Sequence, residues 1–246
     1  MNEVRHHCAR LVLAPILLVQ AIRVRRAVPR LPEAAGEREG EDGAGPRLRI
    51  LVLGDSSAAG VGAATQSEAL VGRLVAALRP AYSVHWKLIA QTGWTSADAI
   101  QHLRNNPAAS FDIAVIALGV NDVTAGRSLR IWLRNLAELA GLLRNRYSVR
   151  HILMSGLPPM HAFPALPHPL RWYLGASARR LDRVLAAWAG GQGDCSHVAL
   201  DFGLDPALAA SDGFHPGPSA YAIWAEAMAS RIRELWGAPA AASDAA

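Results

Sequence analysis

Short apolar runs alternate with longer stretches of helical spacing along most of this 246-residue chain. The short runs favour strands, and they lie at residues 48–53, 82–90, 111–118, 150–156 and 197–202. In the longer stretches apolar residues recur every three or four positions, which predicts helices at roughly 67–79, 96–105, 127–146, 172–190 and 218–235. Near-continuous apolar strands separated by helices predict an α/β fold, with a parallel sheet covered by helices on both faces.

The chain on either side of this pattern divides into three further parts. Residues 1–31 form a basic arm whose apolar run, residues 11–22, is about 12 residues long, short of the roughly 20 that span a bilayer as a helix. Residues 32–46 are acidic and rich in glycine and proline without an apolar period, which predicts a linker. We expect the main domain to occupy residues 47–236 and residues 237–246 to be a mobile tail.

Three interpretations of the arm remain open. Its Arg-flanked apolar run is typical of a segment at a membrane interface, with contact through residues 11–26. The same run could form a helix that packs on the main domain, or a secretory signal. No small-residue cleavage site follows the run, which disfavours the signal. We therefore expect a bacterial-type protein of the cytoplasm or the inner-membrane periphery rather than a secreted one.

The net charge of +5 is located in the arm. Residues 1–30 contain six arginines and one acidic residue, so the other 216 residues carry no net charge. A neutral main domain argues against a broad phosphate-binding face, and we expect no nucleic-acid partner. Two cysteines cannot build a four-cysteine zinc site and the histidines lack metal-ligand spacing, so we expect neither a metal nor a cofactor.

Polar residues follow the predicted strands at four places. They are GDSS at 54–57, Gly93, GVND at 119–122 and DGFH at 212–215, the last just before the final helix. Each alone is ordinary turn or helix-cap chemistry. Ligands of parallel α/β sheets bind at the carboxyl ends of the strands, however, so we expect these residues to meet. Together they supply a hydroxyl, an imidazole, a carboxylate and oxyanion donors, which are the parts of a serine hydrolase.

In this order, the four blocks resemble those of the SGNH hydrolases, also called GDSL lipases or esterases, and the Pro-rich segment 157–175 resembles that of bacterial lysophospholipase-like members. The resemblance covers about residues 48–235. It implies a flavodoxin-like three-layer α/β/α fold around a five-stranded parallel sheet. It also implies a metal-free serine esterase that hydrolyses acyl esters or thioesters through an acyl-enzyme intermediate.

The resemblance assigns roles to five residues. Ser56 matches the nucleophile, His215 the general base and Asp212 the carboxylate that orients the base. The backbone N–H of Ser56, the N–H of Gly93 and the side-chain amide of Asn121 match the oxyanion hole. A serine hydroxyl is a weak nucleophile unless a base takes its proton, and developing negative charge needs preorganised donors, so the chemistry agrees with these roles.

Two further acids, Asp55 and Asp122, stand beside these residues. Short carboxylate side chains in loops readily accept backbone hydrogen bonds. We therefore expect both to brace the loops, and we leave them outside the catalytic set.

The Pro-rich apolar segment 157–175 bears on the substrate. It follows the fourth strand, which predicts either a wall of an acyl pocket or a packed surface loop. A wall, together with the apolar arm, favours lipid-like or medium-chain acyl esters. The alternatives are a carbohydrate O-deacetylase of the same family and, from another class, a non-catalytic binding protein on this scaffold.

Overall fold

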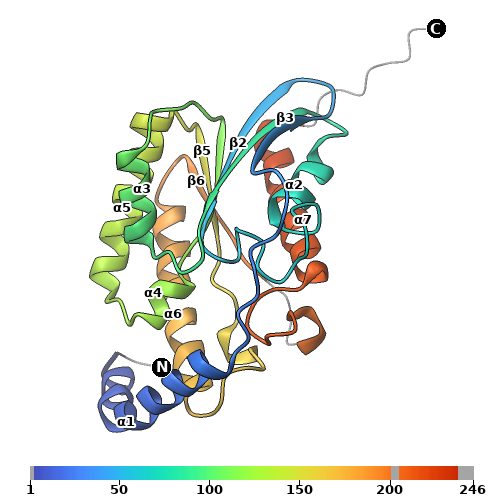
Figure 1. Cartoon of the computed structure of the whole chain (residues 1–246). Helices are drawn as coiled ribbons and strands as arrows, with labels where there is room; N and C mark the ends of the chain where they lie inside the picture. The colour runs from blue at the N-terminus through green and yellow to red at the C-terminus, as the bar shows by residue number, and fades with distance from the viewer. Residues whose placement is uncertain (1–2, 201–204, 238–246) are drawn as a thin grey trace, which may run out of the picture.

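Six strands of the described chain form one sheet between two layers of helices (Figure 1). The computed structural model describes residues 3–200 and 205–237, with side chains from Val12 onward, so all but the first residue of the predicted tail lies outside the described residues. The strands are β1 (Glu39–Asp42), β2 (Arg47–Gly54), β3 (Ser83–Ala90), β4 (Ile113–Ala117), β5 (His151–Ser155) and β6 (Cys195–Val198). Their order across the sheet is β1-β3-β2-β4-β5-β6. β2 to β6 are parallel, whereas β1 runs antiparallel to β3.

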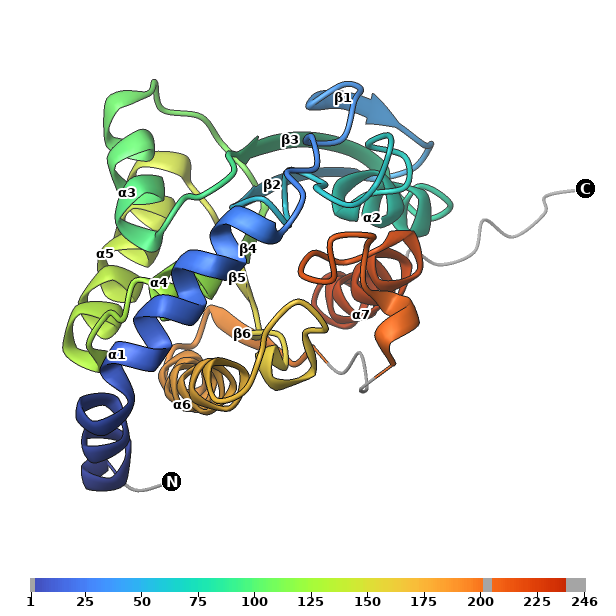
Figure 2. The same cartoon turned by 60° about the horizontal axis from the view of Figure 1, so that its bottom comes forward.

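Helices cover both faces of the sheet. On one face lie α2 (Leu70–Leu78) and α7 (Pro218–Trp236), and on the other lie α3 (Ser96–Asn105), α5 (Leu129–Tyr147) and α6 (Leu170–Gly190), as Figure 1 shows. Three short elements follow the carboxyl ends of β4, β5 and β6: the helix α4 (Val120–Thr124) and the 3-10 turns η1 (Met160–Ala162) and η2 (Pro206–Leu208). The first helix, α1 (Glu3–Ala27), crosses the molecule at this same end (Figure 2).

The core explains why the central strands carry no alternating pattern. All five residues of β4 are buried, because helices cover both of its faces. The helices instead bury one stripe each; α2, for example, turns Leu70, Leu74 and Leu78 inward. The predicted three-layer α/β/α fold with five parallel strands is thus confirmed, with one strand more than predicted.

The additional strand, β1, lies inside the segment predicted as a linker. Its sequence, Glu-Gly-Glu-Asp, lacks apolar alternation because β1 is an edge strand that buries none of its four residues fully. It is held by its ladder with β3 and by side-chain pairs, Lys87 Nζ to Glu39 at 2.7 Å and His85 Nε2 to Glu41 at 3.1 Å. The segment 32–46 therefore contributes to the sheet.

The residues just before β1 are also bound to the main domain. Glu33 accepts hydrogen bonds from the backbone N–H and the hydroxyl of Thr92, both at 2.7 Å. Arg38 donates to the carbonyl of Ala90 at 2.8 Å and pairs with Glu33. The segment thus clasps the loop that follows β3.

The basic arm forms α1, which packs on the domain. Leu17 is buried in the apolar cluster that contains α5 and α6 residues. Gln20 donates to the carbonyl of His168 at 2.6 Å and accepts from the backbone N–H of Leu170 at 3.0 Å, so it holds the start of α6 from both sides. None of the helices in the described part of the chain has the length and apolar character to cross a membrane.

Candidate active site

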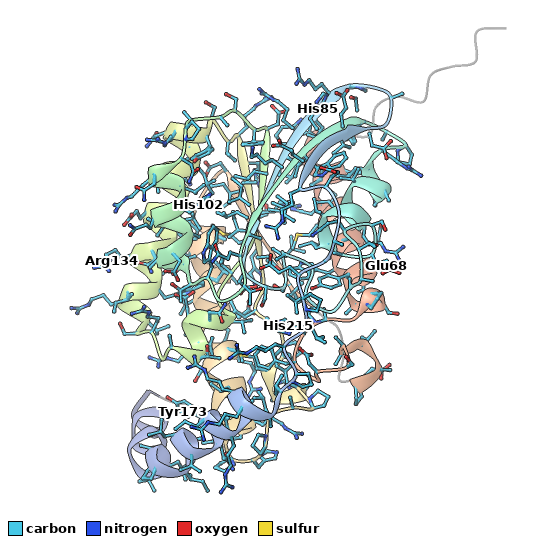
Figure 3. All side chains as sticks on the ribbon, viewed as in Figure 1. Glu68, His85, His102, Arg134, Tyr173 and His215 are labelled. Atoms are coloured by element: carbon cyan, nitrogen blue, oxygen red, sulfur yellow. The ribbon has the colours of Figure 1, made fainter. Side chains whose placement is uncertain are left out.

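Ser56, His215 and Asp212 form a continuous chain of hydrogen bonds beyond the carboxyl ends of the parallel strands. Oγ of Ser56 lies 2.9 Å from Nε2 of His215, and Nδ1 of His215 lies 2.6 Å from Oδ2 of Asp212. Ser56 follows β2, and the other two residues lie in the loop before α7. Figure 3 labels His215 between the sheet and α1. The structure therefore brings together the three residues that the sequence assigned to nucleophile, base and orienting carboxylate.

Asp212 is a buried carboxylate that is kept charged. Its Oδ1 accepts from the backbone N–H groups of Phe214 and His215, at 2.9 and 3.0 Å. Burial alone raises the pKa of Asp212, but the hydrogen bonds from His215 and Phe214 outweigh it and hold that pKa below its usual range. A charged acceptor at Nδ1 keeps the proton on that nitrogen, so Nε2 presents its lone pair to the Ser56 hydroxyl.

A tight turn presents the imidazole. The N–H of Ala210 donates to the carbonyl of His215 at 2.8 Å, and the N–H of Gly213 donates to the carbonyl of Ala210 at 2.9 Å. Gly213 has a φ of +65°, a left-handed conformation that glycine adopts without strain. The block Asp-Gly-Phe-His therefore folds back on itself, and the side chains of Asp212 and His215 meet across the turn.

Asn121 lies in the first turn of α4 with its amide beside the nucleophile loop. Its Nδ2 donates to the carbonyl of Trp94 at 2.9 Å and lies 3.4 Å from Oδ2 of Asp55. The first bond ties α4 to the Gly93 loop. The second contact is long and therefore weak.

Position 93 requires a glycine because of its backbone conformation, not because a side chain would lack space there. Its φ is +90°, which an L side chain rarely adopts, yet none of the described atoms lies within 4 Å of the position where a Cβ would stand. The positive φ sets the direction of the peptide on either side, and Trp94 in the next position offers its carbonyl to Asn121.

Asp55 and Asp122 brace the site loops, as the sequence predicted. Asp55 accepts from the backbone N–H and the hydroxyl of Ser57, at 3.0 and 2.7 Å. Asp122 accepts from the backbone N–H and the hydroxyl of Ser96, at 2.9 and 2.7 Å, and Asn135 donates to the same hydroxyl. Burial raises the pKa of Asp55 to about 6 although the Ser57 bonds lower it, and burial also raises the pKa of Asp122.

An apolar pocket opens beside Ser56 and His215. One wall is residues 158–164, part of the Pro-rich segment, and includes Phe163. The ring of Phe163 packs edge-to-face on that of Phe214, with centroids 5.1 Å apart, which joins the wall to the turn that carries His215. This part of the segment therefore lines a pocket, whereas the last residues of the segment form the first turns of α6.

A second part of the pocket lining was not predicted. Pro206, Leu208 and Ala209 line it from η2 and the residue after it. A 3-10 turn of three residues is too short to show a hydrophobic period, and only its position after a strand could have marked it. Its start is held by Asp205, whose side chain accepts from the N–H of Ala207 at 2.9 Å.

The arrangement suits nucleophilic attack on a carbonyl. It supplies a hydroxyl in contact with an imidazole, a buried carboxylate behind that imidazole, an amide donor nearby and an apolar pocket for a neighbouring chain. Across the residues that the structure describes, no three or more His, Cys, Asp or Glu side chains gather in a group that could hold a metal ion.

Comparisons with known proteins agree on one family. The profile of the GDSL-like lipase/acylhydrolase family matches residues 52–223. A GDSL-like esterase from Mycobacterium tuberculosis is 28% identical over 247 residues, covering 89% of this chain and 76% of that protein.

Two solved structures share the fold. A lipolytic protein of the G-D-S-L family from Veillonella parvula has a TM-score of 0.58 at 15% identity, over 76% of this chain and 97% of that one. A mutant acetyl esterase, crystallised with acetate ion, has a TM-score of 0.57 at 15% identity, over 76% and 97% of the two chains.

Proposed function

The chain belongs to the GDSL-like lipase/acylhydrolase family, and we propose that it is a serine esterase of lipid-like or medium-chain acyl esters with Ser56 as its nucleophile. Its family and its esterase relative make it an ester-hydrolysing enzyme that acts on a small-molecule ester. The observation that carries the finer proposal is the hydrogen-bond chain from Ser56 through His215 to Asp212.

Acylation begins at the Ser56 hydroxyl. Oγ attacks the ester carbonyl carbon while Nε2 of His215 takes the hydroxyl proton, and the carbonyl electron pair moves onto the oxygen. Asp212 stabilises the imidazolium that forms. The tetrahedral intermediate then collapses, the alcohol leaves with the proton from Nε2, and the acyl group stays on Ser56.

Water completes the cycle by the same steps. It attacks the acyl carbon and gives a proton to Nε2, after which the carboxylic acid leaves and Oγ regains its proton from His215. In both halves the negative oxygen is held by donors that are already in place. We assign these donors to the backbone N–H groups of Ser56 and Gly93 and to the Asn121 amide.

The pocket supports an acyl chain rather than a sugar. Phe163 and Leu208 both line it, and most of its lining is apolar. Each CH₂ group that leaves water gains about 0.8 kcal/mol, or roughly fourfold in binding. A chain longer than acetyl can therefore use the pocket for binding energy.

Covalent labelling tests the nucleophile. A fluorophosphonate probe should label the wild-type enzyme and leave Ser56→Ala unlabelled, because the probe reacts with an activated serine. Ser57→Ala is the matched control: its hydroxyl is adjacent in sequence but bonds to Asp55, so that variant should still be labelled. Equal labelling of wild type and Ser56→Ala would remove Ser56 from this role and leave a binding protein or another nucleophile.

A chain-length series tests the substrate class. We expect kcat/KM for p-nitrophenyl esters to rise from acetate to octanoate. Ala162 is one of the residues that line the pocket, and Ala162→Phe puts a larger side chain there. This variant should lower the rate with the octanoate ester and leave the rate with the acetate ester unchanged. Activity confined to the acetate ester would contradict an acyl pocket and favour an O-deacetylase.

A further inference from the structure

The helix α1 has two apolar faces, of which only one packs on the protein. Leu17 is 8% exposed, and Leu13, Ala21 and Val24 lie against the same apolar cluster, at the spacing of one helix face. On the other side, Val12, Ile16 and Val19 are 79%, 46% and 47% exposed. Burying one face is enough to seat the helix on the domain. The exposure of the second face needs another explanation.

Exposed apolar side chains are concentrated at this helix. The described part of the chain exposes seven large apolar side chains, and six of them belong to α1 or to the first turns of α6, which Gln20 of α1 holds. These six are Val12, Ile16, Leu18, Val19, Ile22 and Trp172. A cluster of this kind marks a surface that meets an apolar phase or a partner.

The charges beside this cluster have one sign. Arg23, Arg25, Arg26 and Arg30 follow the apolar run directly and are exposed, and residues 12–32 contain no acidic residue. Exposed apolar residues next to arginines match the boundary of an anionic bilayer, where acyl chains meet negatively charged headgroups. An apolar protein partner would not require these cations.

The position of α1 connects this surface with the pocket. Figure 2 shows α1 crossing the end of the molecule at which the parallel strands finish, beside the segment that leads into α6. Gln20 binds that segment at residues 168 and 170, a few residues past the pocket wall at 158–164. A helix lying in a lipid surface would hold this wall next to that surface.

We propose that the outer face of α1 docks on an anionic membrane surface and holds the pocket end of the molecule against it. Docking uses the five exposed apolar residues of α1 and the four arginines, none of which belongs to the catalytic machinery. It is therefore separable from ester hydrolysis.

Liposome co-sedimentation of the full chain tests the docking. Wild type should sediment with phosphatidylcholine vesicles that contain phosphatidylglycerol, less so with phosphatidylcholine alone, and less at high salt. The double variant Ile16→Ser/Val19→Ser should lower the partition coefficient about tenfold or more, because two side chains lose their burial in lipid. The triple variant Arg23→Gln/Arg25→Gln/Arg26→Gln should remove the preference for the anionic lipid.

The matched control is Ile223→Ser on α7. Ile223 is 46% exposed, like Ile16, but lies on the opposite helix layer, so this variant should sediment as wild type does. All variants should melt as wild type and hydrolyse a soluble short-chain ester at its rate. If neither the wild type nor any variant hydrolyses the ester while the wild type still sediments with the vesicles, the proposed function fails and the docking stands.

Two results would overturn the docking. One is equal sedimentation of wild type and Ile16→Ser/Val19→Ser, or no sedimentation of either. The other is a wild type that is dimeric in light scattering while the double variant is monomeric, which would make the outer face a contact between two copies of the chain.

Discussion

At the scale of single residues, the Asn121 amide connects the loop after β3 with the loop that carries the nucleophile. One hydrogen of Nδ2 goes to the Trp94 carbonyl, and the other makes only a long contact with Asp55. The order of sequence motifs was enough to predict that His215 and Asp212 line up behind Ser56. It could not predict how the amide is turned, since its partner is a backbone carbonyl that any residue type at position 94 would supply.

Removing this amide should slow the chemical step. We expect Asn121→Ala to lower kcat by on the order of 10²-fold with little change in KM, because the donor acts mainly on the charge of the transition state. Thr124→Ala, in the same short helix, is the control and should keep its rate; its hydroxyl bonds only the Asn121 carbonyl. The measurement is steady-state hydrolysis of a soluble ester, with circular dichroism to verify folding. A native kcat in Asn121→Ala would limit the amide to joining the loops.

At the scale of elements, three helices meet at one buried serine. Ser96 begins α3, and its hydroxyl donates to Asp122 of α4 and accepts from Asn135 of α5. This network fixes α4, and with it Asn121, against the loop that contains Gly93. α4 follows β4, whereas the Gly93 loop follows β3. The position of the Asn121 amide relative to the Gly93 N–H therefore depends on this network.

The variant Asp122→Ala tests the network. It leaves the N–H and hydroxyl of Ser96 without their acceptor, so the free energy of unfolding should fall by about 1–3 kcal/mol. The rate should fall as well, with KM nearly unchanged, since the two donors lose their fixed spacing. Asp98→Ala, which removes an exposed helix cap of α3, should lower stability without the loss in kcat. Chemical denaturation and kinetics separate the two effects, and an unchanged kcat in Asp122→Ala would make its role purely structural.

The elements also divide by how well the sequence predicts them. The central strands β2, β4 and β5 are buried on both faces over most of their length, so each of them is an apolar run. β1 and η2 bury little, so their residues are chosen by backbone pairing and turn geometry, which leave no hydrophobic period. The pocket wall at 206–209 was missed for that reason.

At the scale of the whole molecule, the described residues before β2 pack on the domain rather than forming a free linker to it. α1 packs on the α6 side, Glu33 and Arg38 clasp the loop after β3, and β1 extends the sheet. Charge and composition could not show these contacts. Glycine, proline and acidic residues are typical both of linkers and of polar edge strands.

Two truncated chains distinguish the contributions of these parts. A chain that starts at Pro32 loses α1 but keeps the clasp and β1, whereas a chain that starts at Arg47 loses all three. We expect the second to melt at a lower temperature than the first and to hydrolyse a soluble ester more slowly, because Thr92 next to Gly93 loses its contact with Glu33. Thermal melts by circular dichroism measure the difference. Equal melting temperatures would mean that residues 32–46 add nothing to stability.

The edge strand β1 has a further consequence for how copies of this protein behave together. Without it, β3 would expose its row of N–H and C=O groups, the kind of edge on which a strand from another molecule can add. β1 occupies that row, and it carries Glu39, Glu41 and Asp42 within four residues. These acids pair with Lys87, His85 and Arg79, so the outer strand is short and charged, and such an edge strand discourages a strand of a second copy from adding to it. The segment with the weakest folding signal thus protects the sheet at this edge against aggregation.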